Sequence, residues 1–304
     1  MWFKNVRFYT VDLSQFKDIF HDDAAMEETI SKVAFKPCAA QETATIGFAP
    51  LFGKDTPFHF SCGENHYFKL IEENKLLPAS VVKEELSEIV EEKELELKRQ
   101  LRKNEKDALK TAVTGKLLSQ AFSTRRELLI WINFDKNLVG VSATSAKKAE
   151  RALAMLREAF SSFPAQLLSP KVLVDSTMTG WLKENKLPSR FAFGSDVTLK
   201  SPDEDGGVIR ASKEDLISEE ISVHLDAGKV ATEIGLTFDD SLELSLTSEI
   251  AVKRVKPTDI YLEHHLSEKS DDEIADMQSI LVLQGELLTE LSLYLLEIFD
   301  CEHK

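Results

Sequence analysis

The pattern of apolar and polar positions predicts strands and helices in mixed order in the first part of the chain. The opening stretch WFKNVRFYTV is aromatic and β-branched, which predicts a strand. In DDAAMEETISKVAF the apolar residues recur near helical spacing, so we expect a helix with Asp22 or Asp23 as its N-cap. A pair of strands is expected around residues 44 to 71.

The middle of the chain is predicted to be mainly helical. From Ser80 to about Phe122 there is no proline and a single glycine, which is typical of one long helix or a helical pair. Residues 128 to 142 predict a hairpin that turns at Asp135-Lys136-Asn137. In the following SAKKAERALAMLREAF, apolar residues from Ala149 to Phe160 recur at steps of three and four, which predicts an amphipathic helix.

The last part of the chain returns to mixed elements. Residues 170 to 204 are predicted to be rich in loops, and a turn and a helix led by Ser218 follow DGGVIRAS. A second hairpin is expected at about 229 to 256, and a closing helix at about 271 to 299. Mixed strands, hairpins and long helices predict an α+β fold.

Four regions of a multi-domain subunit are predicted from this order of elements. They are an N-terminal α/β part of a central region (1–78), a helical arm with a basic face (79–119), a hairpin plus helix of the central region (120–168), and a C-terminal α+β region (169–304).

Composition narrows the class of protein. The 304 residues carry a net charge of −15, and apolar runs such as LLIWI are far shorter than the roughly 20 residues of a membrane span. No membrane span or secretion signal is therefore expected. The three cysteines, Cys38, Cys62 and Cys301, form no CxxC pair, which favours a reduced cytosolic compartment.

A histidine and cysteine cluster is the one candidate metal site in the pattern. His59, Cys62 and His66 supply three possible ligands within HFSCGENH. The surrounding residues, however, predict two strands around a Gly-Glu-Asn turn. We therefore favour one buried thiol and two histidines flanking a turn, with no metal and no other cofactor.

Motifs of the common catalytic classes are absent from the sequence. The chain contains no GxxxxGK[ST], HExxH or GxSxG pattern. Asp203, Glu204, Asp205 and Glu96 supply the acids that a metal-dependent nuclease uses, but a solvated acidic turn in SPDEDGG explains the first three equally simply. A divergent nuclease or other DNA-processing enzyme remains the alternative to a protein without catalytic residues.

Cations gather between Lys98 and Arg126 although the chain is acidic. Nine cations stand there against two acids, a local charge of 9 − 2 = +7. If the segment is one continuous helix, the six cations from Lys98 to Lys110 project within an arc of roughly 140°. This arc would be a basic face.

Four explanations of the basic face are open. It could be a solvated helix surface, because glutamates such as Glu94 precede it and complement the helix dipole. A membrane-surface helix is disfavoured, since no Trp or Phe anchors its apolar side. An acidic protein partner is a third explanation, and nucleic-acid phosphate is the fourth. If the segment is only solvated, Lys213 and Lys147-Lys148 offer another path for DNA.

Short motifs spread over nearly the whole chain resemble one bacterial family. In order they are MWFKNVRFY at the start, FKPC at 35–38, EKD at 105–107, AFS at 121–123, SAKKAE at 145–150, EDGGVIRA at 204–211, and SEEI with AGKV between 218 and 230. The set is similar to the bacterial recombination-associated protein RdgC family, with residues 240–304 matching least distinctly.

The resemblance implies a DNA-binding protein of the cytoplasm and nucleoid that restrains the RecA recombinase, directly or by competing for DNA. It implies a ring-shaped homodimer whose basic opening accommodates a duplex, with no membrane partner. Lys213 would face DNA, and Phe122 would lie at a subunit contact, although a core Phe ending the long helix is equally consistent with the residues. Relatives can be basic where this chain has Gln120 and Ser212, which would weaken binding here.

The predicted function is therefore binding to DNA without sequence preference, mainly through phosphate contacts. The expected DNA-binding residues are Lys98, Arg99, Arg102, Lys103, Lys106, Lys110, Lys116, Arg125, Arg126 and Lys213.

Overall fold

Strands and helices follow one another in mixed order. The computed structural model describes residues 2–203, 205–266 and 271–302. The strands in these ranges are β1 (Asn5–Thr10), β2 (Ala44–Ala49), β3 (His59–Cys62), β4 (Asn65–Lys75), β5 (Ser123–Asn133), β6 (Leu138–Val141), β7 (Gln166–Leu167), β8 (Phe191–Lys200), β9 (Val208–Ser212), β10 (Val230–Phe238), β11 (Leu242–Thr247) and β12 (Ala251–Pro257). The helices are η1 (Ser14–Phe16), α1 (Lys17–Phe20), α2 (Asp23–Ser31), α3 (Ala79–Leu97), α4 (Lys103–Gln120), α5 (Ala146–Phe160), α6 (Val174–Glu184), α7 (Glu219–Asp226), α8 (Asp259–His265) and α9 (Glu273–Ile298). The predicted α+β class is confirmed.

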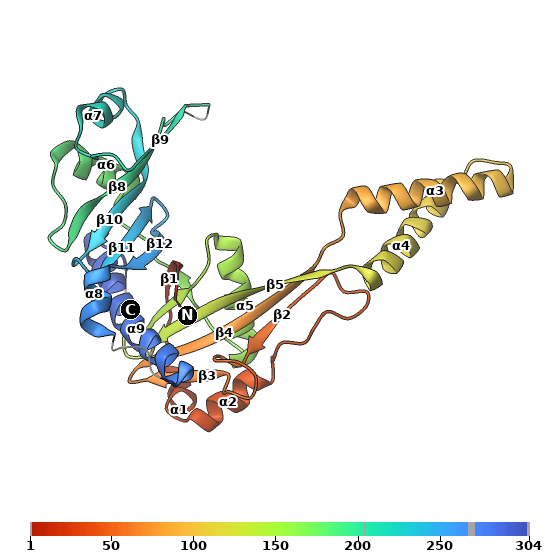
Figure 1. Ribbon diagram of the computed structural model, residues 1–304, viewed down its shortest axis with the longest axis horizontal. Coiled ribbons are helices and arrows are strands. Elements are labelled where there is room, and N and C mark those ends of the chain that lie inside the picture. The colour runs from red at the N-terminus through yellow and green to blue at the C-terminus, as the bar shows by residue number, and fades with distance from the viewer. Residues whose placement is uncertain (1, 204, 267–270, 303–304) are drawn as a thin grey trace.

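One antiparallel sheet runs through the molecule and bends it into an open crescent. Within the described ranges its order is β2-β4-β5-β6-β1-β12-β11-β10-β8-β9, with β3 paired to β4 and β7 to β1. Figure 1 shows α3 and α4 as one limb of the crescent, and the strands β8 to β10 with α6 and α7 as the other. The two limbs leave a concave side between them, near α5.

The first strand joins the two halves of the sheet. On one edge, Arg7 to Thr10 of β1 pair with β6. On the other edge, Asn5 to Arg7 pair with β12, and Tyr9 and Thr10 pair with β7. Because β1 lies between strands from both halves, the crescent is one continuous hydrogen-bonded structure rather than two sheets joined by a linker.

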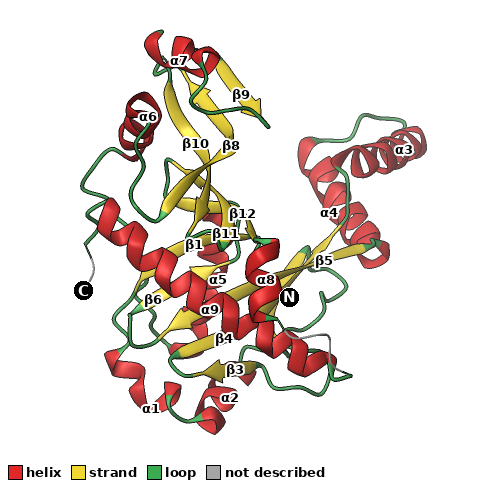
Figure 2. Cartoon of the chain, turned by 60° about the vertical axis from the view of Figure 1, so that its left-hand side comes forward, coloured by secondary structure: helices red, strands yellow, loops and turns green. Residues whose placement is uncertain are grey.

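Two hydrophobic cores cover opposite faces of the sheet. Side chains of a strand alternate between faces, so Val6 and Phe8 of β1 enter one core while Tyr9 and Val11 enter the other. The first core is closed by α6, α7 and α9, and the second by α1, α2 and α5. Figure 2 shows α9 lying diagonally across the sheet. Arg7 alternates with Val6 and Phe8 and points to the same face as α5.

The helical limb stands on a ribbon that leaves the core. In β5 the residues Ser123 to Glu127 are exposed, whereas Leu128 to Asn133 are buried. Beyond the core the strands continue into the hairpin of α3 and α4, called the arm from here on (Figure 1). In α3 no residue is buried, and in α4 only Val113 and Leu118 are. The arm therefore has little core of its own.

The last helix, α9, is the one helix in the described chain that is long and apolar enough to cross a membrane. Its apolar side chains are explained by packing, since 56% of the most apolar stretch is buried inside the protein. Leu288, Leu291 and Leu295 of this helix belong to the first core. An apolar core helix of this kind meets the same length and composition test as a membrane span.

Several predicted elements are confirmed. Asp22 caps α2 by accepting hydrogen bonds from the backbone N–H groups of Ala24 and Ala25. The hairpin of β5 and β6 turns at 135–137, and α5 spans the predicted amphipathic segment. The helix led by Ser218 and the closing helix are also present, as α7 and α9.

Two predictions for the last third of the chain are wrong. Residues 170–204 were expected to be rich in loops, but they contain α6 and β8. The low helix propensity of VDSTMTGWLKE is overcome by burial of Val174, Met178 and Leu182 in the first core. The expected hairpin at 229–256 is a three-stranded meander, β10 to β12.

A close backbone approach explains the glycines in β8 and β10. A Cβ atom added to Gly194 would lie 2.9 Å from the backbone carbon of Gly235. The pairing of β8 with β10 shifts register nearby, between Ile234 and Leu236. Glycine is required because the two backbones come too close for a side chain at this irregularity.

Candidate nucleic-acid interface

The predicted basic helix is interrupted between Leu97 and Lys103, within the cluster of cations. Lys98 ends α3 with a left-handed backbone, φ 51°, and α4 begins only at Lys103. Lys98, Arg99 and Arg102 therefore lie in the turn at the far end of the arm (Figure 1). The prediction of a continuous 140° arc is wrong, although the alternative of a helical pair is confirmed.

Glutamate side chains hold the turn at the end of the arm. Glu94 accepts hydrogen bonds from the backbone N–H of Leu101 at 2.8 Å, and its carboxylate lies 3.0 Å from the Lys106 Nζ. Glu105 accepts from the Arg102 backbone N–H at 2.7 Å and from two nitrogens of Arg99 at 2.9 and 2.7 Å. The Arg99 guanidinium, together with this backbone bond, lowers the pKa of Glu105 to about 2. Arg99, one of the expected DNA-binding residues, is therefore neutralised within the arm.

The predicted DNA-binding cations fall into two groups. Arg99, Lys106, Lys116 and Arg125 form ion pairs with Glu105, Glu94, Glu85 and Glu73. The other six are exposed and form no ion pair with a described residue: Lys98, Arg102, Lys103, Lys110, Arg126 and Lys213. The second group is the one available to an external anion.

Lys213 lies on the opposite limb from the arm. It follows β9 with φ 60°, and its backbone N–H donates to the Asp196 carboxylate at 3.3 Å. Ser212 donates to the same carboxylate oxygen at 2.5 Å. The structure does not bring Lys213 together with the arm cations within one chain, because the two sets lie on different limbs (Figure 1).

Phe122 is among the most exposed apolar side chains in the described chain. It is 85% exposed and sits between the end of α4 and the start of β5, where its carbonyl accepts a hydrogen bond from Leu76. The alternative of a core Phe is therefore wrong. Its exposure leaves the aromatic ring accessible to a second surface.

The histidine cluster is buried and paired. The Nε2 of His59 lies 2.9 Å from the Nδ1 of His66, and the His59 Nδ1 lies 3.6 Å from the Asp23 carboxylate. Burial lowers the pKa of His59 to about 4 and that of His66 to about 3. The two strands and their turn are confirmed, but Cys62 is exposed, so the prediction of a buried thiol is wrong. Among the described residues no group of three or more potential ligands forms a metal site.

The acids considered for a nuclease are not assembled into a site. Asp203 and Asp205 are exposed in the turn before β9, and Glu204 lies outside the described residues. Glu96 is exposed on α3, in the opposite limb (Figure 1). Among the described acids, Asp203 and Asp205 therefore lie on the other limb from Glu96.

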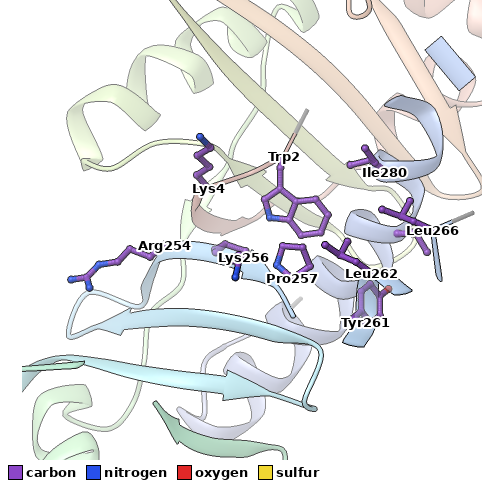
Figure 3. Close-up of a pocket in the computed structure, with 11 residues that line it drawn as sticks. Trp2, Lys4, Arg254, Lys256, Pro257, Tyr261, Leu262, Leu266 and Ile280 are labelled. Atoms are coloured by element: carbon purple, nitrogen blue, oxygen red, sulfur yellow. The ribbon is translucent and has the colours of Figure 1, made fainter. Parts of the chain in front are cut away.

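An apolar cavity of about 520 Å³ lies between β12, α8 and α9. Figure 3 shows Trp2, Pro257, Leu262 and Ile280 around it, with the Arg254 side chain extending away. Its walls supply almost no polar groups. The cavity therefore offers shape and apolar surface rather than catalytic chemistry.

A polar cavity on the concave side contains cations that the pattern did not single out. Arg7, Lys147, Arg210 and Lys253 line it, from β1, α5, β9 and β12. Lys147 alone was considered from the sequence. Arg7 and Lys253 were missed because they belong to strands at opposite ends of the sequence, β1 and β12, and no local pattern indicates that the fold brings them together.

The comparisons with known proteins place the chain in a family. The family model described as "Putative exonuclease, RdgC" matches residues 1–302. The chain belongs to the RdgC family. The resemblance found from short motifs is therefore confirmed.

Curated members of the RdgC family are similar over nearly their full length. The "Recombination-associated protein RdgC" of Shewanella loihica is 35% identical over 300 residues, 98% of this chain and 97% of that protein. The protein of that name in Yersinia enterocolitica is 36% identical over 304 residues, 99% of each. The one from Pseudomonas paraeruginosa is 35% identical over 285 residues, 93% of this chain and 92% of that protein. The family model's description names an exonuclease, and the curated names state an association with recombination.

Proposed function

We propose that this chain binds DNA without sequence preference and restrains RecA-dependent homologous recombination by occupying or encircling DNA. The observation that carries the proposal is an acidic crescent whose two limbs both carry exposed cations with no carboxylate partner in the described chain, such as Lys103 and Lys213. Cations confined to such positions attract a polyanion there while the acidic remainder repels it. The names of the curated RdgC relatives agree with a role in recombination.

The assembly that we propose is a homodimer that closes two crescents into a ring. A two-fold ring needs two contacts for each subunit, and each contact uses the same surface on both partners. Phe122, exposed at the base of the arm, is the candidate for one contact. The cations of both limbs would then face one opening, which accounts for their separation in the single chain.

DNA is the partner that we propose, with the cytoplasm and nucleoid as the location. RecA would be restrained because the protein covers DNA that the recombinase needs, with direct contact as the alternative. No catalytic residue, cofactor or membrane partner belongs to this proposal.

A test of encirclement compares circular and linear DNA. We expect a relaxed plasmid to retain the protein at salt concentrations that release it from a short linear duplex of the same total base pairs. Salt weakens phosphate contacts equally on both, whereas a closed circle also traps a ring topologically. Linearising the plasmid after loading is the control and should release the protein. Equal salt sensitivity on the two forms would reject encirclement.

Competition with RecA tests occupancy. We expect inhibition of RecA strand exchange to depend on the ratio of protein to DNA and to fall when excess competitor duplex is added, because a nonspecific binder distributes over all available sites by mass action. Inhibition that is unchanged by competitor would instead indicate direct contact with RecA.

A second candidate function is DNA cleavage, which the description of the family model favours. Incubating plasmid and linear duplex with the protein and Mg²⁺ or Mn²⁺ tests it. We expect no shortened products at protein concentrations that saturate the DNA. Progressive loss of nucleotides from linear ends would establish an exonuclease and reject the non-enzymatic proposal.

A further inference from the structure

The polar cavity lined by Arg7, Lys147, Arg210 and Lys253 has the features of an anion-binding site, called the seat from here on. Its volume is about 600 Å³, and it lies where β1, the N-terminal end of α5 and the sheet of the C-terminal half meet. In Figure 1, α5 stands between the two limbs of the crescent. Elements that are distant in sequence, from β1 to β12, thus contribute to one cavity, separate from the cations of the arm.

The first observation is the uncapped start of α5. This helix has 15 residues, its N-cap Ser145 makes no side-chain hydrogen bond, and its first turn contains no acid. Within the described chain the backbone N–H groups of Ala146 and Lys147 have no acceptor, and both residues line the cavity. The positive end of the helix dipole therefore points at the cavity with free donors, which is the arrangement that binds phosphate groups.

The second, independent observation is Arg7. This side chain lines the cavity and is only 5% exposed, and its buried Nε has no hydrogen-bond acceptor among the described residues. Its Nη2 donates to the carboxylate of Glu249. One edge of the guanidinium presents Nε and Nη2 together, so a phosphate could take both donors where the carboxylate takes one. A buried donor without an acceptor lowers the stability of the protein, and a bound phosphate would supply the missing acceptor.

The counter-ion of Arg7 lies at the surface of the protein. The Glu249 side chain is 67% exposed and belongs to the turn between β11 and β12. The hydrogen bond from Arg7 lowers the pKa of this carboxyl, so it is ionised at neutral pH and occupies Arg7 as an internal anion. The Glu249 carboxylate can move into solvent, but the buried Arg7 guanidinium then needs another anion in its place, because an uncompensated buried charge is strongly destabilising.

The charge of the cavity favours an anion. Four cations line it (Arg7, Lys147, Arg210, Lys253) against two carboxylates (Glu233, Glu249), which gives 4 − 2 = +2 in a chain of net charge −15. Lys253 is held by Glu233 at 2.8 Å. Lys147 and Arg210 are exposed and have no ion-pair partner in the described ranges.

We propose that this cavity seats one phosphodiester group of bound DNA, held by Arg7, the first N–H groups of α5 and Arg210, and that Glu249 occupies Arg7 when no phosphate is present. The inference rests on the proposed function, because it assigns a backbone phosphate of the same DNA to a defined position. The seat differs from the arm cations because it includes a buried side chain, Arg7, and backbone donors of α5, which hold a phosphate in a fixed register. Free nucleotides also contain a phosphate group, and the experiments below distinguish them from duplex DNA as the ligand.

Substitutions at the N-cap of α5 test phosphate binding while the helix itself is kept. Asp and Asn are equally good N-caps, so Ser145→Asp and Ser145→Asn should both leave α5 intact. Only Asp places a competing negative charge at the N–H groups. With a labelled 30-base-pair duplex and the full-length protein, we expect Ser145→Asp to weaken binding about tenfold and to make the log-log salt slope shallower by about 1 for each seat lost. Ser145→Asn should change affinity by no more than about threefold.

Removal of the internal anion should act in the opposite direction. Glu249→Gln keeps an acceptor for Arg7 but removes the competing charge, so we expect duplex binding to tighten by about threefold or more. Glu243→Gln is the matched control, because it removes one exposed acid from the same sheet at a position that does not line the cavity. Equal effects of the two substitutions, or equal duplex affinity for Ser145→Asp and Ser145→Asn, would overturn the proposal.

Free phosphate or a free nucleotide is the other possible ligand of the cavity, and it is tested separately. Inorganic phosphate and adenosine monophosphate are added to the wild-type protein and to Ser145→Asp, and the melting temperature is measured. Stabilisation of the wild type alone, with duplex affinity equal in both, would reject the DNA assignment in favour of a free nucleotide. If the wild type binds no duplex at any salt concentration, the proposed function fails, and the phosphate titration then decides alone whether the cavity is an anion seat.

Discussion

At the scale of single residues, the buried histidine pair links stability to pH. His59 and His66 lie in hydrogen-bond contact, and the His66 ring packs edge-on against Phe20. Burial holds the pKa of each far below 6.5, at about 4 and about 3. Both rings are therefore neutral in the folded protein at neutral pH, where one can donate to the other.

The sign of the pH effect follows from the lowered pKa values. Between about pH 6.5 and pH 4 the two histidines bind protons in the unfolded chain but not in the folded protein. The contribution of the pair to the free energy of unfolding is therefore fully present above pH 6.5 and decreases as the pH falls. We expect the free energy of unfolding to decrease by about 1–2 kcal/mol between pH 6.5 and pH 5.5 through this pair. Urea denaturation at the two pH values measures the change.

Two variants isolate the contribution of the pair. In the double variant His59→Phe, His66→Leu we expect the decrease over this pH interval to be largely absent, because neither position can bind a proton. His264→Gln removes an exposed histidine and should retain the decrease. An identical pH dependence in the wild type and the double variant would assign the effect to other groups.

At the scale of elements, some cations of the arm are paired with carboxylates and others have no ion-pair partner in the described chain. We expect the triple variant Lys98→Ala, Arg102→Ala, Lys103→Ala to weaken DNA binding and, if half of the six cations in a dimer meet phosphate, to make the salt slope shallower by about 3. The fold should persist, since substitution of exposed charges usually changes stability by no more than about 0.5 kcal/mol for each site. Fluorescence anisotropy over a salt series measures both quantities.

A matched triple on the same arm removes the same number of charges. Arg99→Ala, Lys106→Ala, Lys116→Ala takes away cations that already have carboxylate partners. We expect a smaller change in the slope, because these cations neutralise fewer phosphates. An unchanged slope for the free-cation triple would mean that DNA does not reach the end of the arm.

The arm also shows where sequence reasoning succeeds and where it stops. Helical composition from Ser80 onward was readable, but the break at Lys98 was not, because LKRQLRKNEKD contains neither glycine nor proline. The turn is stabilised instead by Glu94 and Glu105, which accept backbone N–H groups that the helices leave free. Ordinary charged residues carry no turn signal until the fold supplies their partners.

The same limit applies to the candidate site. Clustered cations such as Lys98 to Lys110 are visible in the sequence, whereas the cations of the cavity at Arg7 come from four separate elements. Conversely, α6 was missed because its helix is fixed by burial of Met178 and Trp181 rather than by local propensity. Local patterns predict elements well where propensity and burial agree, as in α5.

At the scale of the whole molecule, the proposed ring depends on exposed apolar contacts. We expect Phe122→Ser to shift the protein from dimer toward monomer at micromolar concentration, because a buried aromatic at a contact is typically worth more than about 1 kcal/mol. The mutant should keep the wild-type circular dichroism spectrum, since an 85% exposed side chain contributes little to the core. Sedimentation equilibrium measures the assembly.

The control for this variant is an exposed leucine on the opposite limb. Leu173→Ser removes an apolar side chain of comparable exposure, 74%, next to α6. It should leave the monomer–dimer equilibrium unchanged if the contact is specific to the base of the arm. A wild-type protein that sediments as a monomer at micromolar concentration would rule out the ring.

The central position of β1 has a consequence for synthesis on the ribosome. The first strand to emerge can pair with β6 once about half of the chain has been made, but its partner on the other edge, β12, begins only at Ala251. Until then the part of that edge from Asn5 to Arg7 stays open, because β7 pairs only with Tyr9 and Thr10. Pairing across nearly 250 residues is slow to form. Nascent and truncated chains that lack β12 should therefore be prone to aggregation and dependent on chaperones, whereas the completed chain closes that edge itself.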